Sequence, residues 1–190
     1  MPTLTPTTAA TTTKKSSVRV QRASPEDVKH LDTIHSFIHR AYRSDASWTR
    51  ESHIVKGERI DHSSLRDILL SGDPPLFLAF SSSPSSSQDA PVGCVEVEFN
   101  DGEAIIGLLA VDPLQQSSGI GSALFRTAEA YIRDSGMTQS AVWVLHQRED
   151  LKPWYIRMGY QPTGRTLDFP PQYETFEPGC YFDIMIKQLV

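Results

Sequence analysis

Apolar residues along this chain follow two different periods, and the change between them locates its central segment. Residues 103–111 form a nearly continuous apolar run, which predicts a strand buried on both faces in the middle of a sheet. Asp112 and Pro113 end this run, because proline has no amide hydrogen to give to a ladder. After Gly121 the apolar residues recur at helical spacing as far as Gly136, which predicts an amphipathic helix that follows a glycine-containing turn.

The rest of the chain is expected to alternate between helices and strands around this segment. Ser24 is a strong helix start, because proline and two acidic residues follow it, and the apolar stripe of that helix reaches Ala41. A second short helix is expected at 63–70 and ends at Gly72. The other expected elements are a short helix at 150–158 and strands at 18–20, 75–80, 91–99, 141–145 and 181–189, the last as a closing strand.

Composition limits the classes of protein to which the chain can belong. With 190 residues and 39% hydrophobic content, one domain is expected over 17–190, after a Thr-, Ala- and Pro-rich tail at 1–16 that is predicted to be disordered. The net charge of -5 argues against nucleic acid as a partner, and no apolar run approaches the ~18 residues of a membrane span. Two cysteines without further ligands at metal spacing predict no metal site and a cytosolic protein, with the nucleus left open.

The turn before the long helix has the features of a phosphate site. The first amide N–H groups of a helix have no intrahelical partner, and the helix dipole adds partial positive charge there. Gly119 and Gly121 lack a Cβ, so a diphosphate can approach the backbone closely. A dinucleotide fingerprint would need a third glycine where Leu124 stands, and a P-loop would need Gly-Lys-Ser/Thr from that position, so neither motif fits.

The segment Gln116-Ser117-Ser118-Gly119-Ile120-Gly121 resembles the Gln/Arg-x-x-Gly-x-Gly/Ala motif of the GCN5-related N-acetyltransferases, the GNAT superfamily. The preceding LLAVDP and the later segment from Trp154 to Tyr160, similar to the family's aromatic-Tyr-x-x-x-Gly-aromatic signature, strengthen the resemblance. It implies an α/β fold with a mixed, mostly antiparallel sheet flanked by helices on both faces. It also implies acetyl-CoA as co-substrate, with a monomer and a homodimer both open.

The resemblance assigns the acetyl-CoA site to Leu109, Ala110, Val111, Gln116, Ser117, Ser118, Gly119, Ile120, Gly121 and Ser122. Many relatives carry Arg or Lys within the loop, where this chain has two serines. We therefore expect the diphosphate to rest on amides and hydroxyls, with somewhat weaker and less salt-sensitive binding.

Transfer of an acetyl group to an amine needs a neutral amine and a proton for the departing thiolate. An alkyl amine of pKa about 10 is only ~0.1% neutral at pH 7, so a base or an ordered water chain is useful. Tyr155 matches the family's general acid. For the base, Glu96 and Glu98 project from one face of the expected strand at 91–99, and His146 follows the strand at 141–145. We favour Glu98 over His146 as the catalytic base, and Glu96 as an acceptor-binding residue.

The acceptor is expected to be the primary amine of a small molecule. Trp48 and Glu51 belong to a segment that commonly forms one wall of the acceptor site in the family. Ile105 aligns with the position at which several protein acetyltransferases of the superfamily carry glutamate. This difference argues against a histone acetyltransferase. A protein or peptide acetyltransferase and a catalytically silent acyl-CoA sensor remain the alternatives. The small-molecule enzyme and the peptide acetyltransferase should differ in the segment 42–60. We expect it to close the cleft in the first and to leave an open groove in the second.

Overall fold

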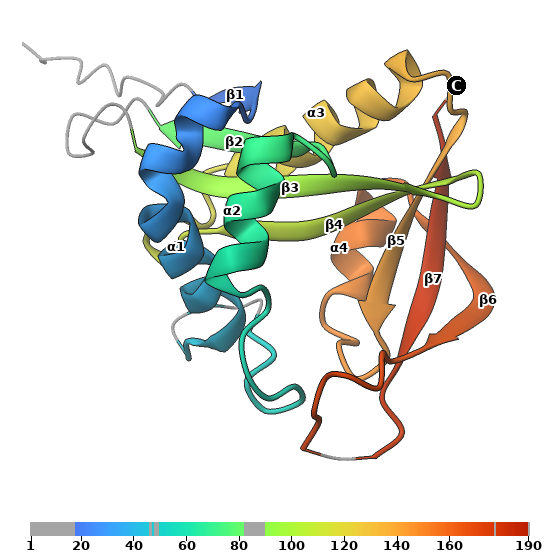
Figure 1. The fold of residues 1–190 in the computed structure, drawn as a ribbon. Coiled ribbons are helices and arrows are strands. Elements are labelled where there is room, and N and C mark those ends of the chain that lie inside the picture. Colours follow the sequence, from blue (N-terminus) through green and yellow to red (C-terminus); the bar gives the residue numbers. More distant parts are fainter. Residues whose placement is uncertain (1–17, 46, 48–49, 82–89, 177, 190) are drawn as a thin grey trace, which may run out of the picture.

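The computed structural model describes residues 18–45, 47, 50–81, 90–176 and 178–189, so the tail predicted at 1–16 and Trp48 lie outside it. One mixed sheet runs through the molecule in the strand order β1-β2-β3-β4-β5-β7-β6 (Figure 1). All neighbouring strands are antiparallel except β4 and β5, which confirms the predicted fold class. The strands are β1 Val18–Arg22, β2 Leu76–Ser81, β3 Pro91–Asn100, β4 Glu103–Val111, β5 Gln139–Leu145, β6 Gln161–Asp168 and β7 Tyr181–Gln188.

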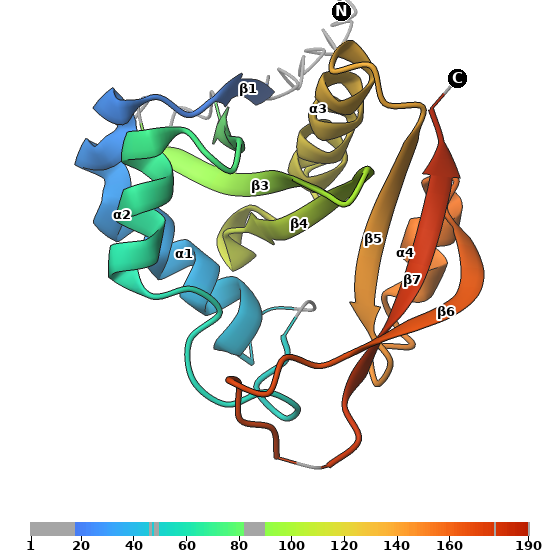
Figure 2. The same cartoon turned by 45° about the vertical axis from the view of Figure 1, so that its right-hand side comes forward.

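Helices cover both faces of this sheet (Figures 1 and 2). Side chains of successive residues point to opposite faces of a strand, so β3 supplies two hydrophobic cores. Val95 and Val97 belong to the core beneath α3, whereas Cys94 belongs to the core beneath α1 and α2. The helices are α1 Leu31–Arg43, α2 His62–Ser71, α3 Ile120–Asp134 and α4 Lys152–Arg157, with single-turn or short 3-10 helices at Pro25–His30 and Pro113–Gln115.

The predicted start of the first helix is correct in position but not in helix type. Ser24 and Asp27 form a capping box, in which the Ser24 N–H donates to Asp27 Oδ2 at 2.9 Å. The first turns, Pro25–His30, are nevertheless 3-10 helix, and the α-helix begins at Leu31. The stripe predicted from sequence is buried from Leu31 to Ala41.

The C-terminal part of the sheet corrects one prediction. β7 does not close the sheet, because β6 pairs with its outer edge and β5 with its inner edge. β6 was not predicted: its sequence, QPTGRTLD, contains proline and glycine, and nearly all of its residues are exposed. An exposed edge strand has no buried face and therefore no apolar alternation by which a sequence could reveal it.

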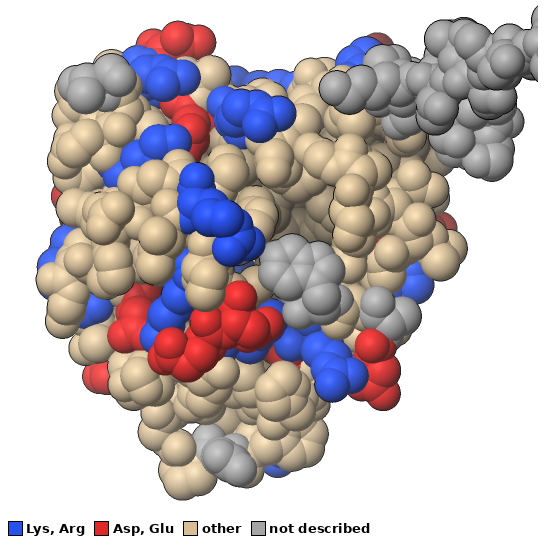
Figure 3. Space-filling view, turned by 180° about the vertical axis from the view of Figure 1, so that it is seen from behind, with Lys and Arg blue, Asp and Glu red and all other residues tan. Residues whose placement is uncertain are grey.

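The described residues include no helix whose length and apolar character would let it cross a membrane. Figure 3 shows the face opposite to that of Figure 1, where acidic and basic side chains are interspersed among uncharged ones. Among the described residues of that face, the basic side chains form no extended field of the kind that binds nucleic acid.

Candidate active site

β4 and β5 are parallel neighbours that separate toward their C-terminal ends (Figure 2). Within these two strands the ladder consists of one pair, Ile105 opposite Ala141. On its other edge β4 slips register against β3 between Cys94 and Glu96, and Leu108 adopts a left-handed φ of 42° there. Such a bulge bends a strand. The sheet therefore opens into a gap in its middle, beyond Ile105.

Backbone groups of β4 face this gap. The Asp112 N–H donates back toward β3 at 2.8 Å, so by alternation the groups of Leu109 and Val111 point toward β5. Side chains hold both carbonyls: the Tyr42 hydroxyl donates to that of Leu109 at 3.1 Å, and Gln116 Nε2 donates to that of Val111 at 3.3 Å. The amide N–H groups of Leu109 and Val111 are then the donors at this edge, as an extended ligand arm would require.

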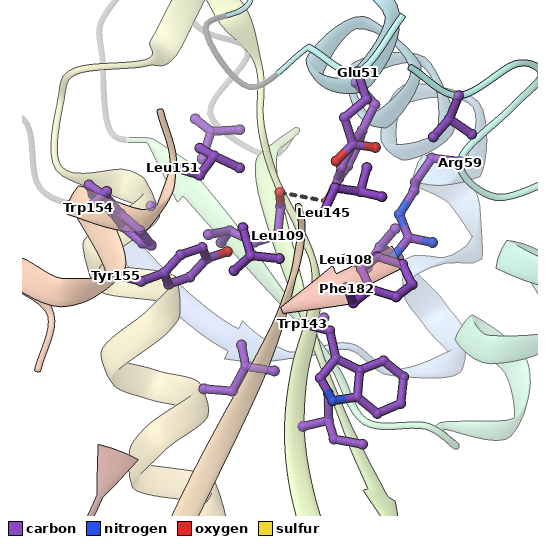
Figure 4. Close-up of a pocket in the computed structure, with 18 of the residues that line it drawn as sticks. Glu51, Arg59, Leu108, Leu109, Trp143, Leu145, Leu151, Trp154, Tyr155 and Phe182 are labelled. Carbon is purple, nitrogen blue, oxygen red and sulfur yellow. Dashed lines mark hydrogen bonds between the residues drawn. The ribbon is translucent and has the colours of Figure 1, made fainter. Parts of the chain in front are cut away.

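A cavity of about 560 Å³ fills the gap, which is within the range of sites for small ligands. We call it the main cavity (Figure 4). Its walls come from β4, β5, α4, the start of α3 and the segments before α2 and β7. Most of the lining is apolar or aromatic, and Trp143 and Phe182 form one wall, with ring centroids 6.2 Å apart.

The glycine turn at the start of α3 lies at one end of the main cavity. Gly119 is the N-cap of α3 and has a φ of 83°, a conformation that costs a residue with a Cβ about 1–2 kcal/mol. A Cβ on Gly121 would meet only Val111 Cγ2, at 3.8 Å, so this position is open to the cavity. Ser117 also has a positive φ, of 63°. Backbone strain of this kind gathers at ligand-binding turns.

Most of the residues predicted for acetyl-CoA line the main cavity, but two do not. Ala110 is 1% exposed and belongs to the core beneath α1 and α2. The Ser118 hydroxyl donates to the Gln115 carbonyl, so it stabilises the turn itself. Those in the lining are Leu109, Val111, Gln116, Ser117, Gly119, Ile120, Gly121 and Ser122.

Tyr155 reaches the main cavity from α4, and its hydroxyl points toward Leu109 (Figure 4). Pro153 is tolerated in α4 because it occupies the first turn, where its missing N–H has no partner to lose. The ring of Tyr155 packs at 5.0 Å from Trp154 and 5.8 Å from Phe125, measured between centroids. Burial raises the pKa of the Tyr155 hydroxyl, which therefore keeps its proton at neutral pH.

The two carboxylates of β3 lie together, but in different environments. Glu96 is only 7% exposed, whereas Glu98 is exposed and lines the main cavity. Burial, helped by a hydrogen bond from the Glu96 carboxyl group to Glu98 and by the charge of Glu98, raises the pKa of Glu96 to about 8. Glu96 therefore keeps its proton at neutral pH.

His146 is not brought together with these residues and does not line the main cavity. Its ring stacks on Tyr181 at 4.3 Å, and its Nδ1 lies 2.9 Å from Asp183 Oδ2. His146, Glu149 and Asp183 could offer three metal ligands, but the Lys152 ammonium lies between the two acids, 2.5 Å from Glu149 and 2.7 Å from Asp183. That ammonium already supplies the positive charge which the acids require.

A group of charged residues lies at the acceptor side of the main cavity. Glu51 was predicted there and lines the main cavity, with its side chain 14% exposed. Burial raises the Glu51 pKa, and the positive charges of Arg59, Arg148 and Arg43 oppose this rise. Arg59 projects into the cavity beside Leu108 and Phe182 (Figure 4). No periodic pattern identifies it, because the described residues 50–60 form no helix or strand.

The loop between β6 and β7 closes the acceptor side over this group. Val55 and Thr175 form an isolated antiparallel bridge. The Lys56 N–H donates to the Glu174 carbonyl at 2.8 Å, and the Phe176 N–H donates to the Ile54 carbonyl at 2.9 Å. We call this joining of the two loops the clasp. From the same loop, Phe169, Pro170, Gln172 and Tyr173 line the main cavity.

The comparisons with known proteins agree with this geometry. The family model of the acetyltransferase (GNAT) domain matches residues 81–162, a segment that contains β3, β4, the glycine turn, α3, β5 and α4. The cavity walls that hold the glycine turn and Tyr155 therefore belong to a GNAT acetyltransferase domain. Residues 81–162 thus match the acetyltransferase domain of the GNAT superfamily, the family of acetyl-CoA-dependent N-acetyltransferases.

Solved structures share the fold over nearly the whole chain. The PaiA N-acetyltransferase of Thermoplasma acidophilum, solved with coenzyme A, is 17% identical with a TM-score of 0.61. The match covers 90% of this chain and 99% of the PaiA chain. The ribosomal-protein-S18-alanine N-acetyltransferase of Escherichia coli is 14% identical with a TM-score of 0.62, covering 91% and 94%. A proposed phosphinothricin N-acetyltransferase is 16% identical with a TM-score of 0.65, covering 92% and 99%. Comparison with curated protein sequences gives no match.

Proposed function

We propose that this protein transfers the acetyl group of acetyl-CoA directly to the primary amine of a small molecule. The observation that carries the proposal is the clasp. It joins the segment before α2 to the loop before β7 through the Val55 and Thr175 bridge and a Lys56 to Glu174 ion pair of 3.4 Å. An extended peptide needs an open groove in which its backbone can lie. A closed wall with aromatic lining suits a compact acceptor instead.

The proposed acetyl-CoA site uses the features at the other end of the main cavity. The amides of the glycine turn would receive the diphosphate, and Gly121 leaves room for its approach. The N–H groups of Leu109 and Val111 would pair with the pantetheine arm as an added strand does. Bound in this way, acetyl-CoA supplies an activated acyl group beside Tyr155.

Proton handling is assigned to residues on opposite walls. Glu98 lines the main cavity and would hold the amine and take its proton, while the neighbouring Glu96 keeps its own proton at neutral pH. Tyr155 keeps its proton at neutral pH and would give it to the departing sulfur. The amine nitrogen forms the new C–N bond as the C–S bond breaks, so no covalent intermediate with the protein is needed. His146, outside the main cavity, is the weaker candidate for the base.

A coenzyme-release assay across small amines, amino acids and short peptides tests this function. We expect at least tenfold higher kcat/KM for the best small acceptor than for peptides that carry the same amine at their N-terminus. A preference for peptides would show that the clasp opens and would favour the peptide acetyltransferase. Tight acetyl-CoA binding without release on any acceptor would favour the silent sensor.

A further inference from the structure

A second cavity meets the main cavity at a set of residues that line both. The lining of the second cavity comes from β3, the start of α2 and the segment before β2. We define the junction as the residues that line both cavities, which are Glu58, Arg59, Glu98, Leu108 and Tyr173. Acetyl-CoA is assigned to the glycine-turn end, so the junction is where an acceptor that enters from the second cavity would meet it.

Arg59 is the cation of this junction. Its Cζ lies 5.5 Å from the centroid of the Tyr42 ring, which fixes the guanidinium against the wall. Burial lowers the pKa of Arg59, but the charge of Glu51 and a hydrogen bond with the Tyr42 side chain favour the charged guanidinium. In the described part of the chain, no carboxylate oxygen lies within 4.0 Å of the Arg59 nitrogens. By contrast, Arg43 Nη1 lies 3.8 Å from Glu51 Oε2.

A guanidinium at the junction can bind an anionic ligand. Arg148, the other guanidinium near Glu51, forms a 2.8 Å ion pair with Asp150. Of the three guanidiniums around Glu51, Arg59 is therefore the one without a carboxylate in contact among the described residues. Its planar fork suits a carboxylate, which it can hold through two parallel N–H···O bonds.

Glu98 lies at the same junction and has the opposite charge. A carboxylate and a guanidinium that face one small cavity complement a ligand that carries both an ammonium and a carboxylate. The apolar wall of Trp143 and Phe182 would receive an uncharged side chain. We infer that the acceptor is an amino acid with an apolar or aromatic side chain, whose carboxylate binds Arg59 while its amine faces Glu98. This inference rests on the proposed function and narrows its class of acceptor.

Matched pairs of acceptors that differ by the carboxylate test the inference. Phenylalanine with phenethylamine and leucine with isoamylamine are such pairs, and the measured quantity is the ratio of kcat/KM within each pair. We expect the parent protein to prefer the amino acid by tenfold or more, mainly through KM. Arg59→Gln should reduce that preference at least tenfold, and Arg59→Lys should reduce it less. Because the ratio is compared between parent and variant, the different amine pKa values within a pair cancel.

Arg50→Gln is the control, because Arg50 pairs with Asp45 and its side chain is 46% exposed, outside the lining of both cavities. It should leave the preference unchanged. Melting of each variant with acetyl-CoA verifies folding and a competent co-substrate site. A preference that is absent in the parent, or unaffected by both Arg59 variants, overturns the inference while the small-amine function stands. Turnover of peptides alone overturns the proposed function and the inference together.

Discussion

Glu96 should make the stability of this protein depend on pH in a direction opposite to that of most carboxyl groups. Its pKa is raised from 4.5 to about 8 in the folded protein, so between these values the folded state holds a proton that the unfolded state has lost. The free energy of unfolding should therefore fall as the pH rises from about 5 to about 8. Above pH 8 this contribution of Glu96 should stay constant. With these two pKa values, the linkage relation gives a loss of up to about 2.5 kcal/mol between pH 5.5 and pH 7.5.

Glu96→Gln isolates this contribution, because glutamine is neutral, has nearly the same shape and can still donate to Glu98. Urea unfolding at pH 5.5 and pH 7.5 measures the free energy of unfolding of parent and variant. We expect the variant to gain stability relative to the parent as pH rises, by up to about 2.5 kcal/mol, while other titrating groups cancel in the difference. Glu26→Gln, at an exposed position, controls for the loss of one negative charge. Parallel pH dependences of Glu96→Gln and parent would refute the raised pKa of Glu96.

Three further predictions concern the reaction itself. Tyr155→Phe keeps the ring contacts with Trp154 and Phe125, so folding and acetyl-CoA binding should survive while turnover falls ~10² or more; full turnover across the pH range would make Tyr155 a packing residue. Gly121→Val fits the fold, since a Cβ there meets only Val111 at 3.8 Å, but it should abolish most of the rise in melting temperature that acetyl-CoA causes; unchanged binding in a titration would move the site elsewhere. Glu98→Gln should lower turnover, with recovery at alkaline pH, if Glu98 is the base, and it should raise the acceptor KM if Glu98 only anchors a cation. His146→Ala should have neither effect. The reverse result would make His146 the base in place of Glu98.

Local sequence determined the central part of this protein because its signals are short-range. The strand at 103–111 has the bounds of β4, since a strand buried on both faces must be apolar at nearly every position. Gly119 is where a left-handed N-cap is needed, and Gly136 and Gly72 follow helices with the positive φ that favours glycine. Tyr155 was placed by its motif, and α4 presents it to the cavity.

Only the tertiary structure decided what surrounds the acceptor. Arg59 and Tyr173 lie more than a hundred residues apart in the chain, and they meet because the clasp brings the loop before β7 against the segment before α2. Glu96 and Glu98 have the same alternation in sequence, yet one is buried and the other exposed, because packing across the sheet ends partway along β3. His146 was a candidate for the base by its position after β5, but the fold turns it toward Asp183, away from the main cavity. Contacts between distant segments have no period along the chain, so such placements cannot be derived from local patterns of apolar and polar residues.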